Sequence, residues 1–207
     1  GLYGPLELPP PTRPDTLIVL ETEGWSQCDE TTRSAFEMIL DQLEDLNVKL
    51  VTRNELPAIE TFEQEIDGSM VLCRILCSYE MRWALRHYQS TGLLSDDLSL
   101  WLEMAEKITL DDYRRALEKR ERVRASLAAL KGLASAMITL SSPGPAPEIE
   151  ALTPSGESGY AFKTGSPAFN AATSVLGSPA LTLPLAAVRG LPLGIQLIGQ
   201  PHTDWDL

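Results

Sequence analysis

The fold is decided by residues 164–199, TGSPAFNAATSVLGSPALTLPLAAVRGLPLGIQLIG. Apolar residues at helical spacing predict a short helix over 167–176, and Gly177 follows where a left-handed residue ends a helix. The runs ALTLPL (180–185) and LPLGIQLIG (191–199) predict two strands joined as a hairpin. This stretch therefore predicts a helix followed by two neighbouring strands of one sheet.

A change of composition precedes this stretch. The run AMITLSS (136–142) predicts a strand, and SPGPAP (142–147) predicts a rigid loop, because its prolines exclude a helix. Residues 153–166 are rich in Gly, Ser and Thr and contain few groups that could build a core. A loop of this kind beside a strand end is typical of a ligand-facing segment. We therefore expect the binding residues of this chain to lie near it.

The beginning of the chain predicts a strand–helix–strand unit. TLIVLE (16–21) and VKLVTR (48–53) are short apolar runs typical of strands. Between them, Asp29 or Thr31 can cap a helix. The apolar residues of that helix recur every three or four positions: Phe36, Ile39, Leu40, Leu43 and Leu46. This order indicates two parallel strands connected by a helix.

Residues 57–131 are predicted to be almost entirely helical. One long segment runs to about His87, and its buried side is marked by Ile66, Met70, Cys73 and Cys77. A second helix begins after Ser95, and a third begins at Thr109 and ends at Gly132. The apolar side of the third helix consists of Tyr113, Leu117, Val123, Leu127 and Leu130.

Together these segments predict an α/β protein in which helices cover a mixed β-sheet. The 207 residues, of which 43% are hydrophobic and 22% charged, are enough for one core and one domain. Residues 1–15 are proline-rich and predict an extended arm or linker. The domain is expected to span residues 16–207.

Several short motifs give this chain a family resemblance. TGSPAFN (164–170), LGSPAL (176–181) and GLPLGIQLIG (190–199), with SPGPAP before them, resemble the C-terminal block of the amidase signature family. The resemblance covers most of residues 16–207 and is sharpest from about 136 onward. It implies a partial amidase-signature fold, whose activity is hydrolysis of a carboxamide to an acid and ammonia or an amine. It implies neither a metal nor an organic cofactor.

The family's catalytic residues are a Lys–cis-Ser–Ser relay beside a glycine-rich segment, and this chain lacks that pattern. It has no Gly-Gly-Ser-Ser run, and its adjacent serines Ser141 and Ser142 lead directly into Pro143. Serines at a strand end are typical of turns. We therefore expect no catalytic residue on this chain. The resemblance implies that the triad lies on a missing N-terminal amidase segment, which would be this chain's partner.

The resemblance also implies which residues bind substrate. The family's Thr-Gly-x-Pro-x-Phe-Asn segment borders the substrate cavity, which corresponds here to Thr164, Phe169, Asn170 and Thr173. Relatives carry an aromatic residue at the position of Thr173, so this chain is expected to have a wider or more polar pocket. In the alternative interpretation, Phe169 and Thr173 only pack a helix against the sheet.

Charge and hydropathy exclude several classes of protein. The net charge is −12, and such a surface repels phosphate backbones and anionic lipid, so we expect neither nucleic acid nor membrane as a partner. No apolar run approaches the roughly 20 residues that span a bilayer. The first residues lack the pattern of a secretory signal and also an initiator Met. We expect a cytoplasmic protein that is a piece of a longer one.

The three cysteines are Cys28, Cys73 and Cys77. This small odd number indicates reduced thiols, as in the cytosol. Cys73 and Cys77 are four residues apart and share one helix face, where they could hold a metal, but neither histidine completes a zinc spacing. Buried, unreactive thiols and no metal site are therefore expected.

Three functional hypotheses follow. In the first, the chain is part of an amidase that acts on a small-molecule amide. In the second, which the missing nucleophile and the acidic surface motivate, it is a non-catalytic interaction or assembly protein derived from an amidase. An unpaired sheet edge would favour a homodimer or another partner. The third, a small-molecule binding domain without chemistry, depends only on the polar loop 153–166.

Overall fold

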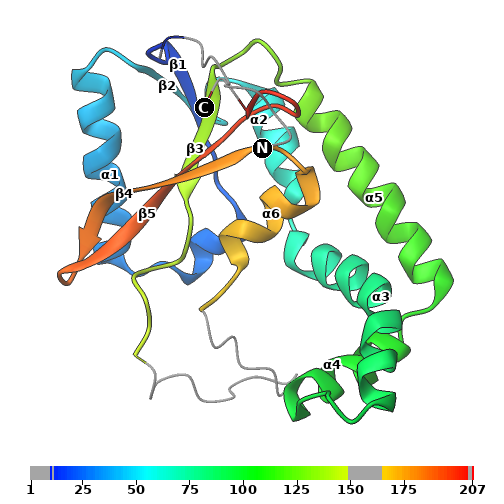
Figure 1. The fold of residues 1–207 in the computed structure, drawn as a ribbon. Coiled ribbons are helices and arrows are strands. Elements are labelled where there is room, and N and C mark those ends of the chain that lie inside the picture. The colour runs from blue at the N-terminus through cyan, green and yellow to red at the C-terminus, as the bar shows by residue number, and fades with distance from the viewer. Residues whose placement is uncertain (1–9, 11, 149–164, 205–206) are drawn as a thin grey trace.

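The computed structural model describes residues 10, 12–148, 165–204 and 207. Its core is a five-stranded sheet with the order β2-β1-β3-β5-β4 (Figure 1). The strands are β1 (Thr16–Val19), β2 (Lys49–Val51), β3 (Ala136–Leu140), β4 (Ala180–Val188) and β5 (Leu191–Ile198). β1 pairs in parallel with β2 and β3, whereas β5 is antiparallel to both β3 and β4. The predicted mixed sheet is confirmed.

Helices lie on both faces of this sheet. They are η1 (Glu23–Gln27), α1 (Glu30–Asp45), α2 (Pro57–Ile66), α3 (Ser69–Ser90), α4 (Asp96–Glu106), α5 (Leu110–Ala128) and α6 (Ala168–Leu176). α3 and α4 extend away from the sheet as a pair of packed helices (Figure 1). Within the described residues, no helix is both long and apolar enough to cross a membrane.

The strand–helix–strand unit forms as its sequence predicts. β1 and β2 are parallel neighbours connected through α1. Of the two predicted candidates, Asp29 is the N-cap of α1. Its carboxylate accepts a hydrogen bond of 2.8 Å from the Thr32 amide. Phe36 and Ile39 are buried on the sheet side of α1, but Leu46 is 58% exposed because α1 ends before it.

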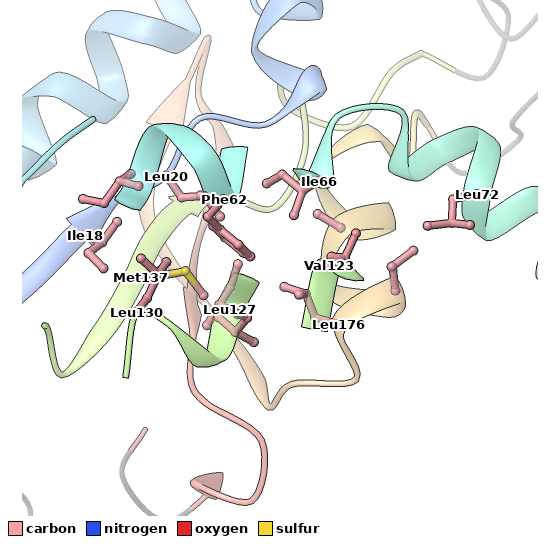
Figure 2. Close-up of a cluster of buried hydrophobic side chains, with 14 of the residues drawn as sticks. Ile18, Leu20, Phe62, Ile66, Leu72, Val123, Leu127, Leu130, Met137 and Leu176 are labelled. Carbon is pink, nitrogen blue, oxygen red and sulfur yellow. The ribbon is translucent and has the colours of Figure 1, made fainter. Parts of the chain in front are cut away.

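Two hydrophobic clusters lie on opposite faces of the sheet. The first combines residues of β1, β3 and β5 with α2, α3, α5 and α6 (Figure 2). The second combines the other face of the same strands with α1 and η1. Since neighbouring strand residues point to opposite sides, Leu17 and Ile138 belong to the second cluster, and Ile18 and Met137 to the first.

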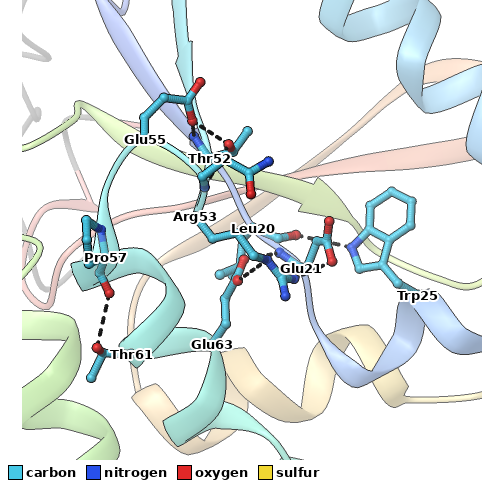
Figure 3. A network of polar contacts seen from close by, with 10 residues as sticks. Leu20, Glu21, Trp25, Thr52, Arg53, Glu55, Pro57, Thr61 and Glu63 are labelled. Atoms are coloured by element: carbon cyan, nitrogen blue, oxygen red, sulfur yellow. Dashed lines mark hydrogen bonds and ion pairs between the residues drawn. The ribbon is translucent and has the colours of Figure 1, made fainter.

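Polar contacts fix the chain that leaves β1 (Figure 3). Glu63 of α2 accepts a hydrogen bond of 2.8 Å from the Glu21 amide and pairs with Arg53, whose Nε lies 2.8 Å from its other carboxylate oxygen. The Trp25 indole donates to the Leu20 carbonyl over 3.1 Å. Burial raises the pKa of Glu63, and the backbone bond and the Arg53 charge oppose that rise.

The helical region differs from its prediction at one point. A single segment was expected through Ile66 and Cys77, but α2 ends at Ile66 and α3 begins at Ser69. Gly68, with a φ of 75°, provides the left-handed residue between them. The break rotates the buried side of α3 onto Leu72 and Leu76, so the prediction that both Cys73 and Cys77 are buried is wrong.

The start of α5 and the final hairpin agree with their sequence signals. Thr109 and Asp112 form a reciprocal capping box at the start of α5. The helix ends at Ala128, earlier than predicted, and Gly132 turns the chain after it with a φ of 84°. β4 and β5 are joined through Arg189 and Gly190, which both have the positive φ that a type I′ hairpin turn requires.

Replacing Asp29 tests whether this N-cap stabilises helix α1. We expect Asp29→Ala to lower the urea midpoint at pH 7, because the Thr32 amide loses its acceptor and the ion pair with Arg189 is lost. Thr31→Ala, at an exposed position in the same turn, is the matched control and should leave the midpoint nearly unchanged.

The difference between wild type and Asp29→Ala should depend on pH. Hydrogen bonding to Thr32, with the Arg189 charge as a smaller cause, lowers the pKa of Asp29 in the folded state. The stabilisation is therefore present above the usual aspartate pKa and is lost as pH falls through the lowered one. Urea melts between neutral and acid pH measure this, and a constant difference across that range would contradict it.

Candidate functional site

A polar row crosses three strands on one face of the sheet. Thr139 of β3, Gln196 of β5 and Thr182 of β4 are register partners, and such partners point to the same side. One row further along the strands, Met137 and Ile198 are register partners within the first hydrophobic cluster. The same face of the sheet therefore changes from apolar to polar toward the carboxyl end of β3.

Asn170 connects helix α6 to this polar row. Its amide nitrogen Nδ2 donates to the Ser141 carbonyl over 3.1 Å, and its oxygen Oδ1 accepts from Gln196 Nε2 over 3.1 Å. The Thr173 hydroxyl donates to the Asn170 carbonyl over 2.8 Å. Asn170 thus links the first turn of α6 to the end of β3 and to the middle of β5.

The adjacent serines directly follow β3, and both hydroxyls contact backbone carbonyls. The Ser141 amide donates to the Gly194 carbonyl of β5 over 3.0 Å, and the Ser141 hydroxyl donates to the same carbonyl over 3.2 Å. The Ser142 hydroxyl donates to the Gly144 carbonyl over 2.7 Å. A nucleophilic serine instead donates to a base. Neither hydroxyl does so here. The Ser142 contact is local, as predicted for a turn, whereas Ser141 pairs across to β5.

Position 194 needs a glycine because neighbouring side chains leave no room for a Cβ atom, and not because of its backbone conformation. A Cβ atom at this position would overlap the Ser141 hydroxyl and would lie 2.6 Å from Cγ2 of Thr182. A glycine inside a strand often allows close approach of a neighbouring backbone. In the structure, the side chains of two flanking strands occupy that space.

The four predicted substrate residues lie in different environments. Asn170 is exposed and Thr173 is half-buried, and their hydrogen bond brings them together beside the sheet. Phe169 is fully buried in the second hydrophobic cluster. The centroids of its ring and the Trp25 ring are 5.5 Å apart, in an edge-to-face arrangement. Thr164 lies outside the described residues. The prediction that the four border a substrate cavity stays a prediction.

Three residues of this site were missed by the sequence reasoning: Thr139, Thr182 and Gln196. A signal for the glutamine was present, since Gln196 interrupts an otherwise apolar strand, and a continuous apolar run predicts burial on both faces. In the structure Thr139 and Gln196 are both buried, and Oγ1 of Thr139 and Oε1 of Gln196 have no hydrogen-bond partner among the described residues. A buried polar atom without a partner costs about 1–3 kcal/mol.

The chemical character of this site is neutral hydrogen bonding. Its side chains are amides and hydroxyls, which bind and orient a polar molecule but do not transfer protons near neutral pH. The described part of the chain contains no group of three or more His, Cys, Asp or Glu side chains that could hold a metal ion. The site therefore has the character of a binding wall and contains no nucleophile–base pair.

Beside this wall lies the outer edge of the sheet. β4 is the terminal strand in the sheet order and pairs only with β5 among the described strands. Apolar side chains are exposed along this hairpin, with Leu181 at 39%, Leu185 at 57% and Leu191 at 45%. Pro184, which lacks an amide donor, lies at an irregularity in the β4–β5 pairing, as expected for an edge strand.

The mixed sheet and its helical covering define an α/β protein with a neutral polar site beside the sheet. The sequence matches the profile of the Amidase family over residues 16–207. The chain belongs to this family, the amidase signature family. No curated protein sequence matches the chain significantly.

Solved structures support the same fold. The crystal structure of an amidase matches 95% of this chain with a TM-score of 0.75 and 24% identity. A bacterial aryl acylamidase of the amidase signature family matches 94% with a TM-score of 0.66 and 12% identity. A 6-aminohexanoate cyclic dimer hydrolase matches 98% with a TM-score of 0.68 and 16% identity. The chain spans only 44%, 41% and 43% of these three structures, respectively.

The packing of Phe169 provides a test of how α6 is positioned. A Cβ atom added at Gly24 would lie 2.6 Å from the Phe169 ring, so we expect Gly24→Ala to destabilise the protein by about 1–3 kcal/mol. Gly144→Ala is the control, because its Cβ would meet only Thr32 Oγ1, at 3.6 Å. In the Gly24→Ala background, Phe169→Leu should lower the free energy of unfolding by less than it does in the wild-type background. If urea melts show that the two effects add strictly, the contact between Gly24 and Phe169 is contradicted.

The hydrogen bonds of Asn170 provide a second test. Asn170→Ala removes a donor to Ser141 and an acceptor for Gln196, so we expect a loss of about 1–3 kcal/mol in the free energy of unfolding. Ser174→Ala, at an exposed position on the same helix, should change it by less than about 0.5 kcal/mol. Equal effects of the two substitutions in urea melts would show that Asn170 does not anchor α6.

Proposed function

We propose that this chain forms the C-terminal part of an amide hydrolase, with the catalytic serines and lysine on polypeptide outside these 207 residues. The observation that carries this proposal is the family match over residues 16–207 in a chain that spans less than half of related amidase structures. The contacts of Ser141 and Ser142 support it, because both hydroxyls donate to backbone carbonyls.

The proposed reaction is acyl transfer from a small-molecule carboxamide to water. A serine outside the chain attacks the amide carbonyl, its proton passes to a base, and a C–O bond forms. The C–N bond then breaks, and the leaving nitrogen takes a proton to depart as ammonia or an amine. Water cleaves the resulting ester to give the acid and the free serine. This scheme requires neither an oxidant nor a metal.

In this scheme the chain provides one wall of the substrate pocket. Asn170 and Thr173 present polar groups at the end of α6, and Thr164 is proposed to join them. The fully buried Phe169 supports this turn of α6 from behind, by packing against Gly24 and Trp25. We propose that this wall orients the amide group of the substrate rather than reacting with it.

The edge strand β4 is the proposed contact with the rest of the enzyme. An unpaired edge offers a row of free backbone donors and acceptors, and exposed Leu181 and Leu185 add apolar surface. Further strands added there would continue the sheet beyond β4. The same edge supports the second hypothesis, a non-catalytic assembly protein or a homodimer, in which another chain would pair with β4.

Isolation from the native source distinguishes these functions. We expect antibody-purified material to release ammonia or an amine from a panel of carboxamides. Its intact mass should exceed 22.7 kDa, or a second chain should be present in equal amount. A fluorophosphonate probe should label a serine outside residues 1–207, located by peptide mass spectrometry.

Two results would contradict the proposal. The first is an active species of 22.7 kDa whose labelled serine lies within this sequence, such as Ser141. The second is purified material that contains the upstream polypeptide, binds no probe and hydrolyses no amide, which would favour the assembly function. Recombinant 207-residue chain is the control and should release no ammonia.

A further inference from the structure

Two thiols lie close together on helix α3. The sulfur atoms of Cys73 and Cys77 are 3.8 Å apart, one helical turn from each other. Cys77 is exposed, whereas Cys73 is half-buried and packs against the first hydrophobic cluster. A small ion can therefore approach the pair from solvent, while the packing of Cys73 holds one of the two sulfurs in place.

The helix that carries these thiols disfavours a disulfide between them. Side chains at positions i and i+4 of a helix have their Cβ atoms about 5–6 Å apart. A disulfide requires a Cβ–Cβ distance of about 3.5–4.5 Å and an S–S bond of about 2 Å. The two sulfurs would have to approach much closer than their 3.8 Å, against an intact helical turn. The pair is therefore suited to remain as two thiols.

The same separation matches a metal ion bridging the two sulfurs. With a zinc–sulfur bond of about 2.3 Å, two sulfurs 3.8 Å apart subtend an angle of about 110° at the metal. This is the tetrahedral angle that Zn²⁺ adopts in proteins. No rearrangement of the backbone is needed, because the sulfurs already have the spacing of two tetrahedral ligands.

We propose that Cys73 and Cys77 form a two-thiolate binding site for a soft divalent cation of the Zn²⁺ and Cd²⁺ type. Thiolate ligands select such ions over the hard cations Mg²⁺ and Ca²⁺, which take oxygen ligands. The described residues offer no cluster of three or more metal-binding side chains, so two coordination positions remain for solvent or for the thiol pair of a second copy. This inference does not depend on the proposed amidase function.

Binding exchanges protons for the metal and involves no redox step. Each S–H group releases its proton to the buffer as a sulfur–metal bond forms, and the ion remains divalent. Burial, and then the neighbouring Cys77, raise the pKa of Cys73 to about 11. A cation between the sulfurs offsets both causes, because its positive charge stabilises the thiolate form of Cys73.

Titration of the reduced 207-residue chain with Cd²⁺, in a phosphine reductant, tests the proposal. We expect ultraviolet thiolate-to-cadmium charge-transfer absorption that saturates at one ion per chain, or at one per two chains when a second copy completes the site. Zn²⁺ should remove this absorption by competition and should protect two of the three thiols from a thiol-reactive dye.

Three variants locate the site. Because even outer-shell changes weaken metal sites about 10–100-fold, we expect Cys77→Ser, which removes a ligand, to weaken Cd²⁺ binding by about 100-fold or more. Cys73→Ser should do the same, whereas Cys28→Ser, on the segment between η1 and α1, should bind like wild type. Circular dichroism checks that each variant keeps its helices. Unchanged binding by Cys77→Ser, or loss of binding in Cys28→Ser, would overturn the assignment.

Discussion

Every other part of this structure depends on the pairing of β3 with strands on both of its sides. β3 pairs in parallel with β1, which belongs to the first strand–helix–strand unit, and antiparallel with β5 of the final hairpin. Four of its five residues are fully buried, so both of its faces lie in hydrophobic clusters. Without this strand, the two halves of the sheet would have no common partner.

The position of α6 follows from that sheet. Phe169 enters the second cluster on one face, and Val175 and Leu176 enter the first cluster on the other. A helix fixed to both clusters has little freedom to shift. The hydrogen bonds of Asn170 to the end of β3 and to the middle of β5 then set where the polar first turn of α6 lies. Apolar packing thus positions the groups that could bind a ligand.

The candidate site and the exposed edge lie side by side in the sheet, because Thr182 of the polar row belongs to β4. The polar row of Thr139, Gln196 and Thr182 contains buried atoms without partners among the described residues, and it runs toward the exposed strand β4. β4 has no second neighbour among the described strands, so the polar row ends at the edge of the sheet.

The sequence by itself determined most of the helices and strands, because several of them carry local signals at their ends. Asp29 and Thr109 cap their helices, and Gly190 allows the hairpin turn. The glycine- and proline-containing motifs after residue 136 determined the family. Only the tertiary structure decided which helix face is buried, because the break at Gly68 changes the phase of α3 and leaves Cys77 exposed beside Cys73. It also decided that Gln196 joins Asn170, since strand register and helix packing bring together residues 26 positions apart.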